Sequence, residues 1–270
     1  PVMYSQRIHH QELPMSRFAD IVRFIEFDLR SDGIIEPEKR RNDCVVHIKD
    51  VIATYRPSVI AKAGLGRGEL LMDIARDFTG TLVVIEPSFT LIREFMERHR
   101  GDAAAEKIKF VNGDFKLFPL DYYAVDCLVC IDYFDLLETG PVMDEFRRAL
   151  QFDGMFVLGQ VVLQDGDLEG AYDDLMREMH LLHTDYYLEE DLKTVMDLKE
   201  FSFIKGNVAF YEEDLEKKLG HLAAFYKEEI KGKNDVLARF REDLAAHYAA
   251  QGDLVKEPYF IGVFQRRKVK

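Results

Sequence analysis

The chain has 270 residues, of which 47% are hydrophobic, and its 36 basic and 49 acidic residues give a net charge of −13. This composition excludes a disordered chain and predicts one large domain, or one domain with a lid. The negative charge argues against nucleic acid and anionic membranes as partners. No apolar stretch has the length of a membrane span or a signal-peptide core, and there are three cysteines, so we expect a cytoplasmic protein.

The predicted elements begin with two helices and continue as an alternation of strands and helices. Apolar residues at helical spacing predict a helix over 17–27; the charge run at 36–41 is expected to be solvated; and Asp43 is a candidate cap for a second helix ending before Pro57. Strands are expected at 58–63, 81–85, 107–111, 125–131 and 154–162, with helices at 69–78, 91–100 and 142–150. This order predicts an α/β fold with a doubly wound, mostly parallel sheet.

The pattern after residue 163 is less regular. Helices are predicted over 168–182, 189–198, 212–230 and 235–250, with one strand or two short strands over 201–210 and a last strand over 258–264. Cys127 and Cys130 form a C-x-x-C pair inside the apolar run 125–131. Residues three apart on a strand point to opposite faces, so we expect both thiols to pack in the core rather than share a metal.

A glycine-rich turn directly follows the first predicted strand, in the order Ala63-Gly64-Leu65-Gly66-Arg67-Gly68-Glu69. Ligands of open α/β sheets bind at this end of the strands, and glycines let the backbone approach them closely. A dinucleotide fingerprint would need glycine at position 69. Glu69 instead places a negative charge where a helix N-terminus would attract a pyrophosphate, so a nicotinamide-dependent oxidoreductase is the less favoured alternative.

The G-x-G-x-G spacing of Gly64, Gly66 and Gly68 resembles the first motif of class I S-adenosylmethionine-dependent methyltransferases. Further motifs follow in the family's order: Glu86-Pro87 after the second strand, Asp114-Phe115 after the third, and the segment 130–137 after the fourth. The resemblance covers about residues 57–163. It implies a seven-stranded sheet with an antiparallel terminal strand at 258–264, next to 201–210.

The resemblance also implies a cofactor, S-adenosylmethionine, and a product, S-adenosylhomocysteine. Glu86 would accept hydrogen bonds from the ribose hydroxyls, and Asp114 would contact the adenine amino group. The expected cofactor-binding residues are Lys62, Ala63, Gly64, Gly66, Gly68, Glu86, Pro87, Asp114, Phe115, Cys130 and Asp132. The family usually has an acidic residue at position 62, so Lys62 leaves open a non-catalytic binding protein. We expect Lys62 to pair with Glu86 or Asp132, and we favour Asp132 because the ribose would occupy Glu86.

On the acceptor side, the candidate catalytic residues are His183 and Tyr186, with His180, Tyr187 and the His9-His10 pair as further possibilities; no metal site is expected. Aromatic residues (Phe18, Phe24, Tyr172, Tyr186 and Tyr187) hint at an apolar or aromatic small-molecule acceptor. The expected organisation is an N-terminal helical cap over 1–56, a cofactor-binding core over 57–163, and lid helices, a helical insertion and terminal strands over 164–270. The acceptor atom stays open, as does a homodimer.

Overall fold

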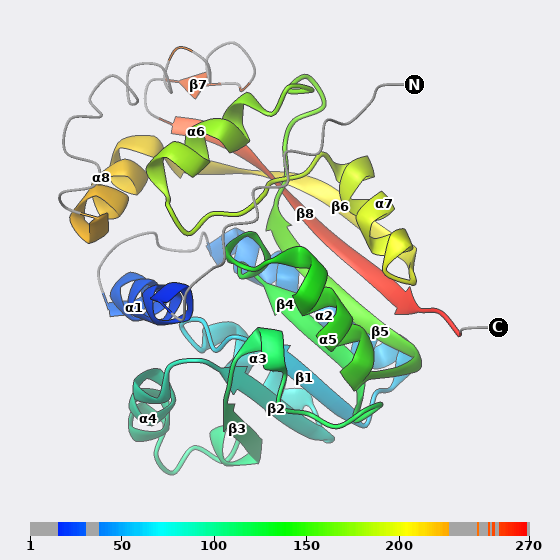
Figure 1. Cartoon of the computed structure of the whole chain (residues 1–270). Coiled ribbons are helices and arrows are strands. Elements are labelled where there is room, and N and C mark those ends of the chain that lie inside the picture. The colour runs from blue at the N-terminus through cyan, green and yellow to red at the C-terminus, as the bar shows by residue number, and fades with distance from the viewer. Residues whose placement is uncertain are drawn as a thin grey trace.

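The computed structural model describes residues 16–30, 38–226, 242, 248, 250–251 and 254–268 (Figure 1). Its strands are β1 (Val59–Ala63), β2 (Thr81–Glu86), β3 (Ile108–Asn112), β4 (Val125–Ile131), β5 (Leu150–Val161), β6 (Phe201–Asp214), β7 (Ala250–Gln251) and β8 (Leu254–Arg266). They form one sheet in the order β3-β2-β1-β4-β5-β8-β6, with the short β7 beside β8. The predicted α/β sheet is therefore confirmed.

Strands β1 to β5 run parallel, and β8 lies antiparallel between β5 and β6, as the family resemblance implies. The parallel strands are apolar on both faces because helices cover both. In β4 every residue except Asp126 is buried. Cys127 and Cys130 lie in this strand as free thiols, and burial raises the pKa of each to about 12. Their predicted place in the core is confirmed.

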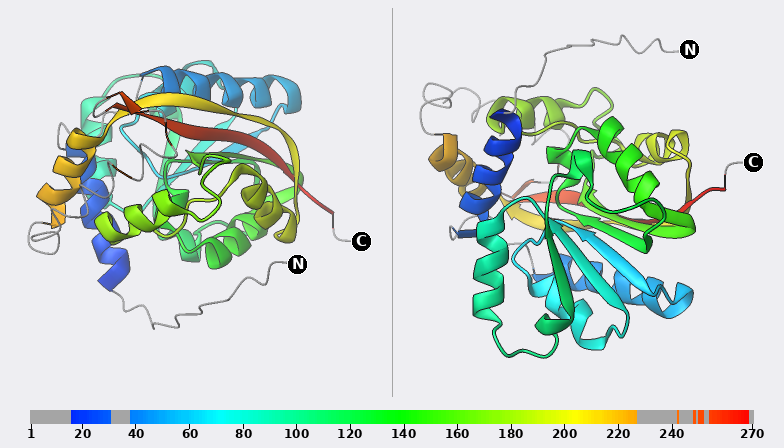
Figure 2. Two further views of the ribbon diagram at one scale, coloured as in Figure 1. Left: turned by 90° about the horizontal axis from the view of Figure 1, so that it is seen from above. Right: turned by 60° about the horizontal axis from the view of Figure 1, so that its bottom comes forward.

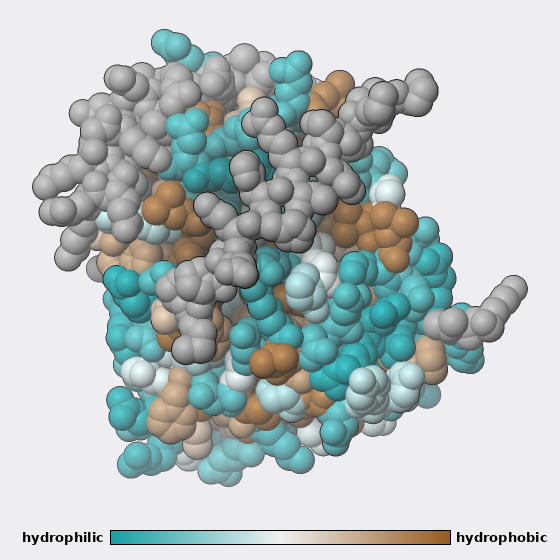
Figure 3. Space-filling view, in the orientation of Figure 1, coloured by the Kyte–Doolittle hydropathy of each residue, from teal (hydrophilic) through white to brown (hydrophobic). Residues whose placement is uncertain are grey.

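The helices are α1 (Ser16–Arg30), α2 (Glu38–Tyr55), α3 (Glu69–Asp77), α4 (Phe89–Arg98), α5 (Thr139–Ala149), α6 (Ala171–Met179), α7 (Glu189–Leu198) and α8 (Leu215–Tyr226). Figure 2 shows α2 on one face of the sheet and α5 and α7 on the other. None of the described helices is long and apolar enough to cross a membrane. On the face seen in Figure 3, hydrophobic residues form small groups among hydrophilic ones.

Helices α1, α6 and α8, here called the cap, gather near the carboxyl ends of the parallel strands (Figure 1). Phe24 of α1 is their common contact. Its ring centroid lies 5.2 Å from that of Phe225 in α8 and 4.4 Å from that of His180, which follows α6. The cap therefore consists of segments from both ends of the chain, held together by apolar and aromatic packing.

Two predicted helix starts are wrong. Helix α2 begins at Glu38, and the expected cap residue Asp43 lies inside it, where its carboxylate accepts a hydrogen bond from the Tyr211 hydroxyl (2.6 Å). The helix predicted from residue 212 begins later because β6 continues to Asp214, which is paired with Leu254 of β8. Pairing with a neighbouring strand outweighs the local helical pattern there.

Two other segments differ in length from their predictions. The segment predicted as one or two strands over 201–210 is a single strand with one irregularity between Phe203 and Lys205. Helix α6 is shorter than predicted because Gly170 has a φ of 74° and Asp167 accepts hydrogen bonds from the first amides of the helix, those of Ala171 (2.7 Å) and Tyr172 (3.0 Å). The helix predicted over 235–250 lies almost entirely outside the described residues.

Candidate functional site

The glycine loop, residues 63–68, joins β1 to α3. Gly64, Gly66 and Gly68 have φ angles of 77°, 61° and 88°, which glycine adopts without strain. A Cβ atom at Gly64 would lie 2.2 Å from the ring of Tyr133, and one at Gly68 would lie 2.5 Å from the ring of Phe95. Packing therefore also requires glycine at positions 64 and 68, whereas the Cβ direction of Gly66 faces open space.

Glu86 ends β2 and holds this loop in place. Its carboxylate accepts hydrogen bonds from the backbone amides of Leu65 (2.7 Å) and Ser88 (2.8 Å), and the residue is fully buried. Burial raises the pKa of Glu86, although the two backbone bonds oppose this rise. The residue expected to bind the ribose hydroxyls is thus bound to the protein backbone in this structure.

Tyr133 follows β4 and covers the glycine loop. Its hydroxyl accepts a hydrogen bond from the Gly66 amide (3.3 Å), and its ring lies against Gly64 and, edge-on, 5.8 Å from the ring of Phe115. Burial raises the pKa of Tyr133 well above its ordinary value. At pH 7 the Tyr133 side chain is therefore uncharged, and it fills the space above the glycine loop.

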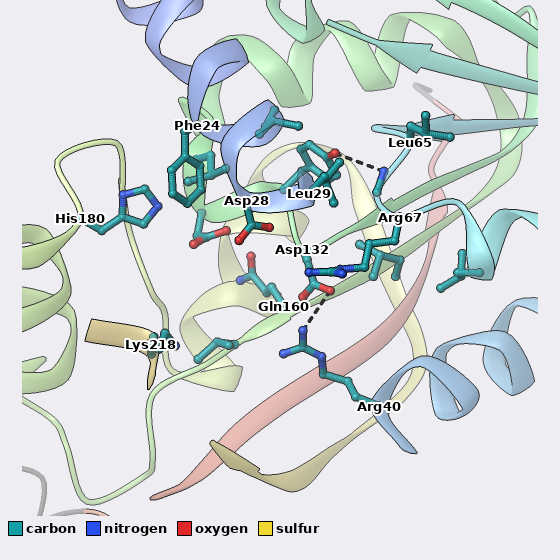
Figure 4. Close-up of a pocket in the computed structure, with 18 of the residues that line it drawn as sticks. Phe24, Asp28, Leu29, Arg40, Leu65, Arg67, Asp132, Gln160, His180 and Lys218 are labelled. Atoms are coloured by element: carbon teal, nitrogen blue, oxygen red, sulfur yellow. Dashed lines mark hydrogen bonds and ion pairs between the residues drawn. The ribbon is translucent and has the colours of Figure 1, made fainter. Parts of the chain in front are cut away.

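A cavity of about 200 Å³ lies beside Tyr133, between the carboxyl ends of β1, β4 and β5 and the cap (Figure 4). This end of a parallel sheet is where ligands of doubly wound folds bind. The volume is below the range of roughly 300–1,000 Å³ that is typical of small-molecule sites. The cavity therefore has room for a small group or for part of a larger ligand.

Three carboxylates line the cavity, and each is paired with an arginine or a histidine. Asp28 lies 2.8 Å from His221, Asp132 lies 3.4 Å from Arg40, and Asp135 lies 3.5 Å from His183. The carboxylate is the more exposed side chain in each pair: 26% against 4%, 33% against 9%, and 17% against 0%. These pairs therefore offer mainly carboxylate oxygens to a ligand.

Lys62, near the end of β1, is buried, and its ammonium donates a hydrogen bond to the carbonyl of Gly64 (2.6 Å). The expected pairing of Lys62 with Asp132 is wrong, because Arg40 is the cation within hydrogen-bond distance of that carboxylate. Burial raises the pKa of Asp132; Arg40 lowers it most among the nearby charges, and Lys62 lowers it less. Arg40 lies in the run expected to be solvated, yet it is buried, with its guanidinium 4.8 Å from the centre of the Tyr259 ring.

Gln160, near the end of β5, is buried and lines the cavity. Among the described residues, neither atom of its side-chain amide has a hydrogen-bond partner. Figure 4 shows Gln160, Asp28 and Asp132 converging on the centre of the cavity from different elements. A buried amide without a partner is costly, so this side chain is placed as though a ligand completes its bonds.

A buried ion pair forms another wall of the cavity. The Lys218 ammonium lies 2.7 Å from the carboxylate of Glu257, which also accepts a hydrogen bond from the Tyr172 hydroxyl (2.6 Å). Burial alone would raise the pKa of Glu257, but Lys218 lowers it overall. Glu213 lies on the same wall, and burial raises its pKa.

The comparisons with known proteins agree with this architecture. A family model described as a methyltransferase domain matches residues 60–154, from β1 into β5. Residues 60–154 form a methyltransferase domain. No curated protein matches the chain in sequence.

Solved structures share the fold of this methyltransferase domain and of most of the chain. The YcgJ protein from Bacillus subtilis matches with a TM-score of 0.66 at 12% identity, over 84% of this chain and 100% of that one. A methyltransferase from Thiobacillus denitrificans, in complex with S-adenosyl-L-homocysteine, matches with a TM-score of 0.56 at 14% identity, over 92% and 98%. The [4+2]-cyclase SpnF matches with a TM-score of 0.60 at 16% identity, over 94% and 96%. At these identities the similarity shows a common fold.

The cavity brings together some of the residues expected to bind the cofactor, but not all. Lys62, Gly66, Gly68 and Asp132 line it. The expected residues that do not line it are Ala63, Gly64, Glu86, Pro87, Asp114, Phe115 and Cys130. Asp114 accepts a hydrogen bond from the Lys116 amide (3.0 Å), which closes a local turn of the methyltransferase domain.

The two candidate catalytic residues have different environments. Tyr186 lines the cavity, and burial raises its pKa well above the ordinary value. His183 does not line it; one ring nitrogen lies 2.7 Å from Asp173, and the other faces Asp135. Burial lowers the pKa of His183, but these two carboxylates raise it overall. This geometry favours a positioning role for His183 in the wall behind Asp135.

The other candidates on the acceptor side are His180, Tyr187 and the His9-His10 pair. His180 lines the cavity, lies 2.5 Å from the Tyr226 hydroxyl, and has its pKa lowered by burial to about 3, so it is neutral at pH 7. Tyr187 lies outside the cavity and 3.2 Å from the Thr139 hydroxyl. The His9-His10 pair lies outside the described residues.

The aromatic residues that hinted at an apolar acceptor mostly lie elsewhere. Of the five, Phe24 and Tyr186 line the cavity, which is otherwise rich in charged side chains. The sequence analysis included Tyr133 only as part of the segment 130–137, and it did not identify Asp28, Arg40, Gln160, Lys218 or Glu257. Gln160 had a visible signal, because it is a polar residue inside the apolar run from Met155 to Leu163. The rest come from elements brought together only by folding.

Proposed function

We propose that this protein transfers the methyl group of S-adenosylmethionine to a small-molecule acceptor and releases S-adenosylhomocysteine. The observation that carries the proposal is the glycine loop, which opens at the carboxyl end of β1 onto a cavity between the methyltransferase domain and the cap. We also propose that residues 57–163 hold the cofactor, while α1 and the described part of the segment 164–270 enclose the acceptor.

The residues of the cavity fit the methionine half of this cofactor. Lys62 and Arg67 supply cations suited to a carboxylate, and Asp132 supplies a carboxylate suited to an ammonium group. The carboxylate oxygens at the cavity also suit a sulfonium ion. When bound, the cofactor supplies an electrophilic methyl group.

The nucleoside half fits only after Tyr133 moves, because its ring covers Gly64, while Glu86 is closed off by backbone amides. We propose that the Tyr133 side chain turns to another rotamer when the cofactor enters. This movement would free the space above Gly64 next to Phe115. It would also lengthen a cavity that is too small as it stands.

The chain's own residues then act by positioning and by excluding water. Phe24, Leu29 and Met176 form an apolar part of the wall, which keeps water from the reacting groups. The carboxylates hold the positive charge of the reacting system in a fixed polar environment. Orientation of two reactants in this way supplies much of the rate of a displacement reaction.

Calorimetric titration of the full chain with S-adenosylmethionine, S-adenosylhomocysteine and NAD tests the proposal. We expect the first two to bind and NAD not to bind. In thermal unfolding, a ligand at 100 times its dissociation constant stabilises the fold by about 2.7 kcal/mol. Binding of NAD alone would refute the proposal in favour of the oxidoreductase.

A second candidate is a protein that binds the cofactor without transferring its methyl group. Lys62 favours this alternative because it stands where the family usually has an acidic residue, and SpnF, with a similar fold, is named as a cyclase. Mass spectrometry of S-adenosylmethionine incubated with the protein and a mixture of metabolites separates the two. Release of S-adenosylhomocysteine supports transfer, whereas tight binding without release supports the alternative.

A further inference from the structure

We propose that the acceptor is a small primary or secondary amine that also carries an oxygen atom, held between Asp28 and Gln160. This inference rests on the proposed function, because it names the substrate class of the same cavity. Two observations support it. In each ion pair at the cavity the carboxylate is the more exposed partner, and the side-chain amide of Gln160 has no hydrogen-bond partner among the described residues.

The ion pairs offer mainly carboxylate oxygens to the cavity. In each of the three pairs the carboxylate lines the cavity and is the more exposed partner; His221 and His183 do not line the cavity, whereas Arg40 does. Of the cations that line the cavity, Lys218 pairs with Glu257 and Arg40 with Asp132. Lys62 and Arg67 belong to the end of β1 and the glycine loop, which we assign to the cofactor. An anionic acceptor would meet the carboxylates of Asp28 and Asp135, whereas an ammonium group or a nitrogen gaining positive charge would be stabilised by them.

Asp28 and Gln160 are the pair best placed for the acceptor. Asp28 comes from the cap helix α1 and Gln160 from the end of β5, and both side chains point into the cavity (Figure 4). Asp132 lies nearer the glycine loop, with Arg67 beside it in this view, and is left to the cofactor's ammonium. The cofactor and the acceptor thus use different carboxylates.

The Gln160 amide further restricts which functional groups the acceptor can carry. It offers one carbonyl acceptor and an NH₂ donor, and both are without partners among the described residues. In its ammonium form the amine donates one N–H to the Gln160 carbonyl and a second N–H to Asp28. The NH₂ group then needs an acceptor on the same small molecule, such as a hydroxyl or carbonyl oxygen. An amino alcohol meets all three conditions within a cavity of about 200 Å³.

The methyl transfer does not need a general base in the cavity. The ammonium form of the acceptor first loses one proton to bulk water. The lone pair of the neutral nitrogen then forms the new N–C bond while the C–S bond breaks and its electrons stay on sulfur. The positive charge moves from sulfur to nitrogen, and Asp28 stabilises it there.

Binding to the full chain without cofactor tests the inference, with three probes of similar size and different charge. N-Methylethanolamine is the amine, 2-methoxyethanol its neutral match and methoxyacetate its anionic match. Ligand-observed NMR and calorimetry should show the amine binding at least tenfold more tightly than either match. Equal binding of the amine and the ether would overturn the inference.

Two variants and a matched control assign the site. Asp28→Asn should weaken amine binding at least tenfold, whereas Asp20→Asn, which changes the same charge on α1 at a residue paired with Arg23 outside the cavity, should not. Gln160→Met tests the amide separately if Asp28→Asn fails to fold, and it should also weaken amine binding. Undiminished amine binding by folded Asp28→Asn or by Gln160→Met would overturn the inference.

S-adenosylhomocysteine affinity, measured on the same samples, separates this inference from the proposed function. We expect Asp28→Asn to keep that affinity while it loses the amine. A wild-type protein that binds S-adenosylhomocysteine but prefers the ether or the anion refutes the amine and leaves methyl transfer standing. A wild-type protein that binds the amine but no S-adenosylhomocysteine supports the amine site and refutes the proposed cofactor.

Discussion

Replacing Gln160 by methionine should make the protein more stable. The side chain is buried in β5 with neither amide atom hydrogen-bonded among the described residues, and methionine has nearly the same length and shape. Removing a buried polar group without a partner recovers its desolvation penalty of about 1–3 kcal/mol. For a chain of this size, the Tm should rise by roughly 2–4 °C for each kcal/mol gained.

Urea unfolding followed by far-UV circular dichroism measures this change, since the chain has no tryptophan for fluorescence. Gln151→Met is the matched control, because Gln151 lies in the same strand and is exposed. The control should stay within about 0.5 kcal/mol of the wild type. A Gln160→Met variant no more stable than the wild type, with an unchanged slope m, would refute the reasoning that this amide lacks a partner.

Three further variants test other parts of the site. Tyr133→Ala should bind S-adenosylhomocysteine at least about tenfold more tightly in calorimetry. In the wild type, the Tyr133 ring is turned away from Gly64 in about 10% or less of the molecules, which lowers the apparent affinity by that fraction, and the variant removes this cost. Weaker binding would show that the ring belongs to the binding site. Glu257→Leu should lose about 3–5 kcal/mol in urea unfolding by leaving the Lys218 ammonium buried, and adding Lys218→Met should recover most of it; an equally unstable double variant would contradict this. The pKa of His183 is raised in the fold, so its charge stabilises the protein below the unfolded pKa of about 6.5, and this contribution is lost as the pH rises through the folded pKa. His183→Gln should therefore cost more stability, relative to the wild type, at pH 5.5 than at pH 9, and equal losses would count against the raised pKa.

The sheet could be predicted because its signals are local. Apolar runs and helical spacing from β1 to β5 are properties of short windows, and their alternation permits few topologies. The glycine loop was likewise visible, since a strand, three glycines and an amphipathic helix follow one another directly. The end of β6 was missed because its last residues are held by β8, which lies much later in the chain.

The site was harder to predict because its decisive contacts are not local. Arg40 stood in a charge run that suggested a solvated surface, yet folding places it between Asp132 and the Tyr259 ring. Glu86 was expected at the correct strand end, but no local pattern showed that the Leu65 and Ser88 amides would bind its carboxylate. Spacing identifies which backbone ends meet at an edge of the sheet, whereas the partners of each side chain depend on the whole fold.

The place of β8 in the sheet also determines how folding can finish. β5 and β6 do not pair with each other. Each pairs with β8, which lies between them and contacts them through buried residues such as Phe260 and Val263. Pairing of segments so distant in sequence is slow, because a long loop must close first. Until β8 enters, two strand edges are exposed, and such edges pair readily with other molecules. Refolding at high protein concentration should therefore favour aggregates in which another chain's strand takes the place of β8.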